Sequence, residues 1–214
     1  MQRKLLLNLI LVLGILSFHA SAIEINIDGK LDEEEWASAR QITKYYETMP
    51  FTLAEPSHSQ KVLILEDEKG IYFGFINIQK NETIRKQKHQ RDEEMANADM
   101  VGVSLDFDGD GLLSYGFTIS AGGSINDSVV RNENEMDYDW DADWKHGAHI
   151  EGDAWYAEMF IPWTIAPMKA QKGTKRKIKY SFYRWLRGDF IVYTTTKGNP
   201  VSYTHLTLPT IVGV

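Results

Sequence analysis

An aromatic pair surrounded by polar side chains is the feature of this sequence best suited to binding chemistry. Tyr183 and Trp185 share one face of a predicted strand, opposite the apolar face. The other residues of their face are polar: Lys179, Ser181 and Arg187. Aromatic faces stack on the C–H groups of pyranose rings, while polar neighbours bind the hydroxyls. Tyr183 and Trp185 are therefore candidate sugar-binding residues; packing beneath a loop is the alternative for Trp185.

A second aromatic group lies in an acidic segment, where carboxylates and rings alternate from residue 137 to residue 144. Trp140 and Trp144 are candidates for contact with a sugar edge. The alternative is a surface loop whose rings cap the core. Arg91 is a candidate for binding sugar hydroxyls, with an ion pair to Asp92 or Asp99 as its alternative.

Three aspartates in a predicted turn are candidate metal ligands. Asp106, Asp108 and Asp110 match the start of an EF-hand loop, but the twelfth position is Phe117 instead of a bidentate glutamate. An EF-hand is excluded on that ground. A looser structural Ca²⁺ site remains, with Asp139 of the acidic segment as a fourth ligand and a solvated hairpin turn as the alternative.

The sequence offers little for catalysis. It contains no cysteine, which excludes thiolate chemistry and disulfides, and His146 and His149 point to opposite faces of a predicted strand. A glycosidase needs two facing carboxylates. Glu158, between Tyr156 and Phe160 on its strand face, is the one carboxylate placed for a raised pKa. We therefore predict no catalytic residues and keep a small β-sandwich glycosidase as an alternative.

The pattern of elements predicts an all-β fold, an antiparallel, jelly-roll-like β-sandwich with one short N-terminal helix. That helix is expected to begin at Asp32 and to bury Trp36. Trp155 alternates with other apolar residues and is expected in the core. The predicted strands are separated by glycine-bearing turns and a proline-containing loop at 45–59: residues 23–27, 61–66, 71–78, 101–105, 112–120, 124–130, 144–151, 154–161, 178–186 and 190–196.

Both ends of the chain differ from the predicted domain at 23–200. Residues 1–22 combine two basic residues, an apolar run and the triplet Ala20-Ser21-Ala22, a pattern typical of a signal peptide. It predicts export to the periplasm, the outer membrane or the medium; an uncleaved membrane anchor is the alternative. Residues 201–210 are the codon-for-codon translation of a sequencing adapter, so 201–214 is interpreted as foreign sequence and the native protein is expected to continue beyond Pro200.

The net charge of the chain limits the classes of molecule that it can bind. Lys and Arg number 23 and Asp and Glu 30, a net charge of −7. Removing residues 1–22 takes away two basic and no acidic residues, so 21 − 30 leaves −9. This field repels phosphate backbones and excludes nucleic acid as a partner.

The order and spacing of several short motifs resemble the family 9 carbohydrate-binding domains and the related N-terminal domain of large bacterial outer-membrane proteins. The likeness covers residues 24 to 190. The matching residues are Ile27-Asp28-Gly29, Leu31-Asp32-Glu33, Trp36, Arg91-Asp92, Asp99, Asp106, Tyr115, Phe117, Gly123, Asp127, Trp144, Asp153-Ala154-Trp155, Glu158 and Ile161-Pro162. The resemblance implies a β-sandwich that grips the end of a sugar chain between two tryptophans, with structural calcium nearby.

Together these observations predict a non-catalytic carbohydrate-binding module of an exported protein, linked to polysaccharide breakdown. Its expected partners are a polysaccharide or oligosaccharide and a downstream barrel or catalytic domain of the native chain. The main alternative is an interaction or lid domain of an outer-membrane barrel protein, without sugar affinity.

Overall fold

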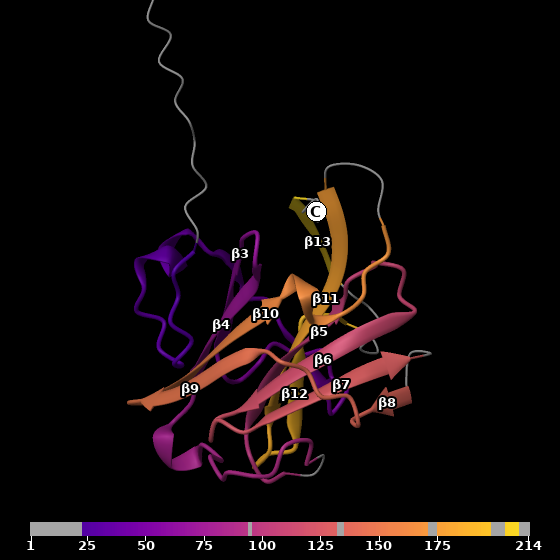
Figure 1. Cartoon of the computed structure of the whole chain (residues 1–214). Helices are drawn as coiled ribbons and strands as arrows, with labels where there is room; N and C mark the ends of the chain where they lie inside the picture. Colours follow the sequence, from indigo (N-terminus) through magenta and orange to yellow (C-terminus); the bar gives the residue numbers. More distant parts are fainter. Residues whose placement is uncertain (1–22, 94–95, 132–134, 171–174, 198–203, 210–214) are drawn as a thin grey trace, which may run out of the picture.

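The computed structural model describes residues 23–93, 96–131, 135–170 and 175–197, together with the backbone of 204–209. Within these residues the chain forms two antiparallel β-sheets joined by short 3₁₀ turns (Figure 1). The predicted all-β antiparallel sandwich is confirmed. In the same ranges, no helix has the length and apolar character needed to cross a membrane.

One sheet has five strands in the order β1-β3-β4-β10-β9. Its longest pairing joins β10 to β4 over nine residue pairs. The predicted hairpins β3–β4 and β9–β10 are both present. The strands are β1 (Arg40–Ile42), β3 (Gln60–Glu66), β4 (Gly70–Ile78), β9 (Lys145–Glu151) and β10 (Ala154–Pro162).

The other sheet has eight strands, seven of them in the order β2-β12-β11-β5-β6-β7-β8. The eighth, β13, pairs with β11 between Lys175 and Tyr180. The strands are β2 (Tyr46–Met49), β5 (Met100–Asp106), β6 (Leu113–Ser120), β7 (Ile125–Arg131), β8 (Glu135–Asp137), β11 (Lys175–Leu186), β12 (Ile191–Thr194) and β13 (Thr204–Pro209).

Alternate residues of each strand build the core between the two sheets, as strand geometry requires. Phe182 of the eight-stranded sheet contacts the rings of Phe73 and Phe75 in the five-stranded sheet, with centroids 5.3 Å and 5.9 Å away. Trp155 is completely buried beside them, as predicted. This apolar interface orients the outer faces and the strand ends.

A second apolar layer covers the outer face of the five-stranded sheet. Residues from Ile23 to Ala39 lie across it, and Trp36 packs there with Leu63 and Tyr72. Trp36 is buried as expected, but in this outer layer and not at the end of the main core. The segment therefore extends the hydrophobic interior to a third layer.

Glu158 of β10 fastens that N-terminal segment to the sheet. Its Oε2 accepts the backbone N–H groups of Asp28 at 2.9 Å and Gly29 at 2.8 Å, and its Oε1 accepts the indole N–H of Trp36 at 3.2 Å. Gly29 has φ +93°, and a Cβ there would collide with the backbone of Ala148. Glycine is therefore required for this close approach.

The sequence predictions fail locally in several places, among them β1, since no strand was predicted there. Residues 23–27 are extended but pair with no described strand, because they cover a sheet face instead of an edge. The short helix is the 3₁₀ turn η1 (Glu34–Ser38), which follows Glu33 without a side-chain cap, so Asp32 does not cap it. The predicted loops contain the short edge strands β2 and β8. The partner of β2 is the distant strand β12, whereas β8 pairs with the preceding strand β7. Two further 3₁₀ turns are η2 (Asn81–Thr83) and η3 (Trp163–Ile165).

The predicted signal peptide, residues 1–22, lies outside the described residues. Of the predicted foreign segment, 201–214, the structure describes the backbone of β13, which pairs with β11. The origin of that segment stays a prediction from the sequence.

Glu158 should make stability depend on pH. Burial raises its pKa from the usual 4.5 to about 7, although its N–H donors act in the opposite direction. Because the folded pKa is the higher one, the contribution to stability is complete below pH 4.5 and is lost as pH rises through about 7. Between about pH 5 and 8, the wild type should therefore lose unfolding free energy relative to Glu158→Gln.

Urea denaturation of both proteins across that range measures the difference. Identical pH dependence in the two proteins would show that Glu158 does not titrate as described.

Candidate functional site

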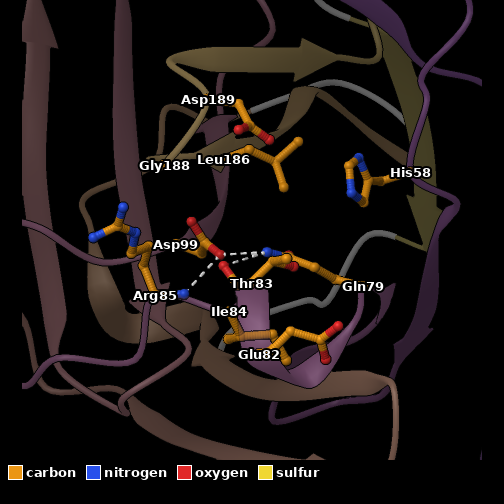
Figure 2. Close-up of a pocket in the computed structure, with 10 residues that line it drawn as sticks. All are labelled: His58, Gln79, Glu82, Thr83, Ile84, Arg85, Asp99, Leu186, Gly188 and Asp189. Carbon is orange, nitrogen blue, oxygen red and sulfur yellow. Dashed lines mark hydrogen bonds between the residues drawn. The ribbon is translucent and has the colours of Figure 1, made fainter.

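A pocket of about 440 Å³ opens at the end of the sandwich where β4 and β11 end and β5 begins. Its walls come from four separate parts of the chain, and most of the side chains are polar (Figure 2). The lining residues are His58, Gln79, Glu82, Thr83, Ile84, Arg85, Asp99, Leu186, Gly188 and Asp189. None of these was predicted as a binding residue.

A hydrogen-bonded chain of buried side chains forms the floor of the pocket. Asp99 is 1% exposed, and its Oδ2 accepts the Gln79 amide N–H at 2.7 Å and the backbone N–H of Arg85 at 3.0 Å. The Gln79 Oε1 accepts a guanidinium N–H of Arg184 at 2.8 Å. Arg184 points into the core; burial lowers its pKa to about 10, so it remains a cation near neutral pH. Gln79 thus links a buried anion to a buried cation.

Four ionisable side chains lie at the pocket opening, and Arg85 is the cationic one among them. Asp189 extends into the opening from the β11–β12 turn, His58 from the segment before β3, and Glu82 from η2 (Figure 2). Burial and the positive charge of Arg184 lower the pKa of His58. His58 is therefore neutral near pH 7, where its ring offers one hydrogen-bond donor and one acceptor.

The β11–β12 turn places aromatic rings beside this polar pocket. The guanidinium carbon of Arg187 lies 4.6 Å from the ring centroid of Trp185 and 5.6 Å from that of Phe190. The backbone N–H of Arg187 is bound by Asp99 at 2.8 Å, which couples the turn to the pocket floor. Phe190 is 64% exposed and adopts φ +55°, a left-handed conformation that is unfavourable for a bulky residue.

Trp185 is partly exposed, as its strand face predicted. It packs against a small cluster formed by Ala96, Ala98 and Met100. Tyr183 shares that outer face, where its ring crosses Gly102 and its hydroxyl hydrogen-bonds with that of Thr118. Burial raises the pKa of Tyr183 to about 12, so the hydroxyl stays protonated. The structure brings the two predicted residues together, with Trp185 nearer the pocket.

Trp140 and Trp144 lie on the inner side of the eight-stranded sheet, opposite Tyr183 and Trp185. Trp144 is 6% exposed and contacts the Phe117 ring at a centroid distance of 5.5 Å. Because the core encloses its ring, Trp144 offers little surface for the predicted contact with a sugar edge. Trp140 is half-buried against Tyr115 and Phe117, so it also packs on the core.

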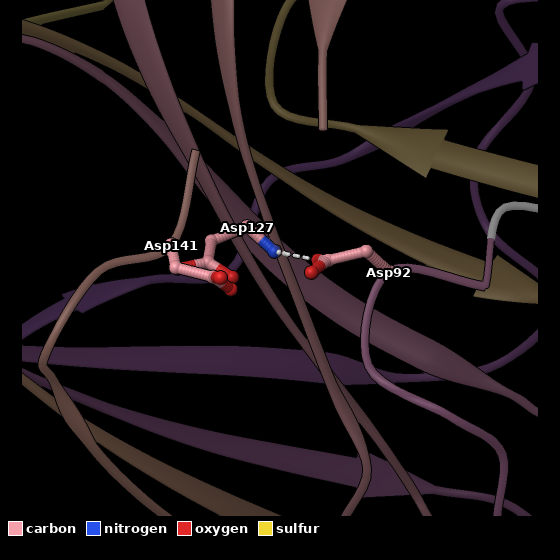
Figure 3. Close-up of side chains that lie close together, drawn as sticks. All are labelled: Asp92, Asp127 and Asp141. Carbon is pink, nitrogen blue, oxygen red and sulfur yellow. Dashed lines mark hydrogen bonds between the residues drawn. The ribbon is translucent and has the colours of Figure 1, made fainter. Parts of the chain in front are cut away.

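Arg91 lies among three carboxylates and does not line the pocket. Its guanidinium lies 2.7 Å from Asp127, 2.8 Å from Asp141 and 3.5 Å from Asp92. Figure 3 shows these three carboxylates converging from a loop, β7 and the acidic segment. Arg91 does pair with Asp92, as its alternative reading held, but the shortest contact is to Asp127.

The aspartates predicted as calcium ligands are also engaged by the protein itself. The two Asp106 oxygens accept backbone N–H groups from Asp108, Gly109 and Gly111 at 2.7–3.1 Å. The Lys169 ammonium lies 2.7 Å from Asp110 and 3.7 Å from Asp108.

Asp139 is exposed, and among the described residues the acidic group with mutually close oxygens is Asp92, Asp127 and Asp141 instead. An arginine or lysine accompanies each group of carboxylates. As arranged, these residues do not fit a calcium site.

Sequence reasoning missed Gln79, Asp99 and Phe190 as contributors to this end of the molecule. The sequence gives little indication of their role, because the hydrogen-bonded chain of Gln79, Asp99 and Arg184 joins residues up to 105 positions apart. The sequence predicts a turn at 187–189 and places Phe190 at the start of a strand, whereas β12 begins at Ile191. The positive φ at Phe190 is not visible in the sequence.

Comparisons with known proteins identify the fold. No model of a protein family matches the chain, and no curated protein matches it. Among solved structures, a family 9 carbohydrate-binding module from Caldicellulosiruptor kristjanssonii in complex with glucose aligns with a TM-score of 0.59 and 11% identity, covering 85% of this chain and 90% of that one. The complex with cellotriose aligns with a TM-score of 0.58 and 14% identity, covering 87% and 90%. The fold is that of family 9 carbohydrate-binding modules.

The calcium site predicted from the sequence can be tested directly. A cation that binds the folded state raises its melting temperature by mass action. Because Arg91 and Lys169 already neutralise the acidic groups, we expect the same melting temperature in millimolar calcium and in excess chelator. Thermal melts in both buffers measure this, and a clear rise with calcium would reinstate the site predicted from the sequence.

Proposed function

We propose that this chain is a carbohydrate-binding module that binds oligosaccharide in the end pocket and against the neighbouring aromatic rings. One observation carries the proposal: the β11–β12 turn supplies Asp189 to the polar pocket and Phe190 to the exposed aromatic surface. The family 9 fold supports it, since structures of that fold have been solved with glucose and cellotriose.

The pocket has suitable size and chemistry for a sugar unit. Its volume of about 440 Å³ lies within the usual range of small-molecule sites. Glu82 and Asp189 offer acceptors to sugar hydroxyls, and neutral His58 offers its Nε2, since its Nδ1 lies 3.1 Å from the Ser57 hydroxyl. The hydrogen bonds on Asp99 hold the floor in place before a ligand arrives, which limits the entropy lost on binding.

Binding without catalysis is part of the proposal. Glu158 has the raised pKa suited to a general acid, but all its described partners belong to the N-terminal segment that covers it. It also lies on the outer face of the five-stranded sheet, away from the pocket. This arrangement favours a structural role for Glu158 over the small-glycosidase alternative.

The proposal extends to the biological setting through the sequence. The N-terminal pattern supports export, and an exported sugar-binding module would hold a polysaccharide near a catalytic or barrel domain of the native chain. Such tethering raises the local concentration of substrate and would assist polysaccharide breakdown.

Removal of the aromatic rings should weaken sugar binding. Trp185→Ala and Phe190→Ala should each cost about 1–3 kcal/mol of binding free energy, as for aromatic residues that dominate an interface. Isothermal titration with glucose and cellotriose measures the affinities. Leu112→Ala is the matched control, because Leu112 is 68% exposed beyond the opposite end of β5.

If both aromatic variants bound sugar as tightly as the wild type, the sugar site would not include these rings and the proposed location would be wrong. An absence of oligosaccharide binding in the wild type would favour the interaction or lid domain without sugar affinity.

Phe190 is expected to lower the folding stability of the domain through its backbone conformation, while its ring contributes to sugar binding. Its left-handed conformation costs about 1–2 kcal/mol in a non-glycine residue, whereas glycine adopts it freely. Phe190→Gly and Phe190→Ala remove the same ring and should both weaken sugar binding. The glycine variant should nevertheless be the more stable by about 1 kcal/mol. Chemical denaturation of the pair tests this; a less stable glycine variant would show that the turn imposes no strain.

A further inference from the structure

The charge of the end pocket suggests which sugars it prefers. Some exposed carboxylates of the described chain are paired with neighbouring cations: Arg91 binds Asp141, and Lys169 binds Asp110. No such ion pair holds Glu82 or Asp189 within the described residues. Both carboxylates are exposed, and both face the pocket opening (Figure 2).

The cations near the pocket do not cancel this charge. The Arg85 guanidinium points away from Glu82 and His58 (Figure 2) and lies beside Gly188, where its Nε would be 3.3 Å from a Cβ. Arg184 is buried behind the floor and is connected through Gln79 to Asp99, so its charge is balanced there. With His58 neutral, the exposed lining carries two carboxylates, Glu82 and Asp189, against one cation, Arg85, so negative charge is in excess there.

We infer that the pocket selects sugar units carrying a protonated primary amine, such as glucosamine, over neutral and acidic sugars. An ammonium group has three N–H donors and no acceptor, so it complements either Glu82 or Asp189, which face the pocket from opposite sides (Figure 2). A uronate would meet like charge at the same positions. The inference rests on the proposed function, since it names the class of sugar for the same site.

A set of three oligomers of one length isolates the amine. β-1,4-linked glucosamine hexamer, its N-acetylated counterpart and cellohexaose share the linkage and differ at one ring position. At about pH 6 and low salt, the amine-bearing hexamer should bind about five- to tenfold more tightly than the other two, a gain expected from exposed ion pairs. The preference should shrink at about 0.5 M salt because screening weakens such pairs.

A variant of the pocket carboxylates and a control variant test whether these carboxylates cause the preference for amine-bearing sugars. In the Glu82→Gln, Asp189→Asn double variant, the ratio of affinities for the amine-bearing and acetylated hexamers should fall to about one. Glu34→Gln removes an exposed carboxylate on η1, outside the pocket, and should leave the ratio at its wild-type value. Isothermal titration of all three hexamers against each protein gives the ratios.

The outcomes separate the two proposals. Equal affinity of the wild type for all three hexamers would overturn the amine preference and leave carbohydrate binding in place. A preference that survives in the double variant would also overturn it, because the amine would then be recognised elsewhere. Absence of binding to every hexamer would overturn the carbohydrate-binding proposal together with the inference.

Discussion

The placement of Arg184 inside the sandwich is the constraint on which this end of the molecule depends. A buried guanidinium loses its hydration, and the loss is offset only when its donors find acceptors. Arg184 satisfies two of its nitrogens with the carbonyls of Ser59 and Ile78 and with the Gln79 side chain. These partners fix the start of β3 and the end of β4 relative to β11.

Gln79 transmits that constraint to the pocket. Its amide group accepts from the cation and donates to Asp99, so it fits only in one orientation. Asp99 in turn binds the backbone of Arg85 and of Arg187. The loop after η2 and the β11–β12 turn are therefore positioned by one buried chain of hydrogen bonds, in which Gln79 links Arg184 to Asp99. Truncation of any member would leave the others buried without compensation.

Local pattern predicted much of this architecture. Strict alternation identified the inner face of β10 through Trp155 and the outer face of β11 through Trp185, because a sheet side must be consistently apolar or polar. It did not predict the burial of Trp144, since strand parity says nothing about rings that fold back from a loop onto the core. It also gave no warning of Arg184, a charged residue on an apolar face whose partner Gln79 is 105 residues away. Such long-range compensation is a property of the tertiary structure alone.

The contact between Glu158 and the N-terminal segment also has a consequence for how the chain folds. Asp28 and Gly29 depend on a carboxylate 130 and 129 residues further along the chain. The sheet face that the segment covers is completed only once β10 has paired with β4 and β9. Contacts of such high sequence separation form slowly, because a long loop must close first. The part of the domain that emerges first from the ribosome is therefore among the last to find its place, and its apolar side chains stay exposed until then.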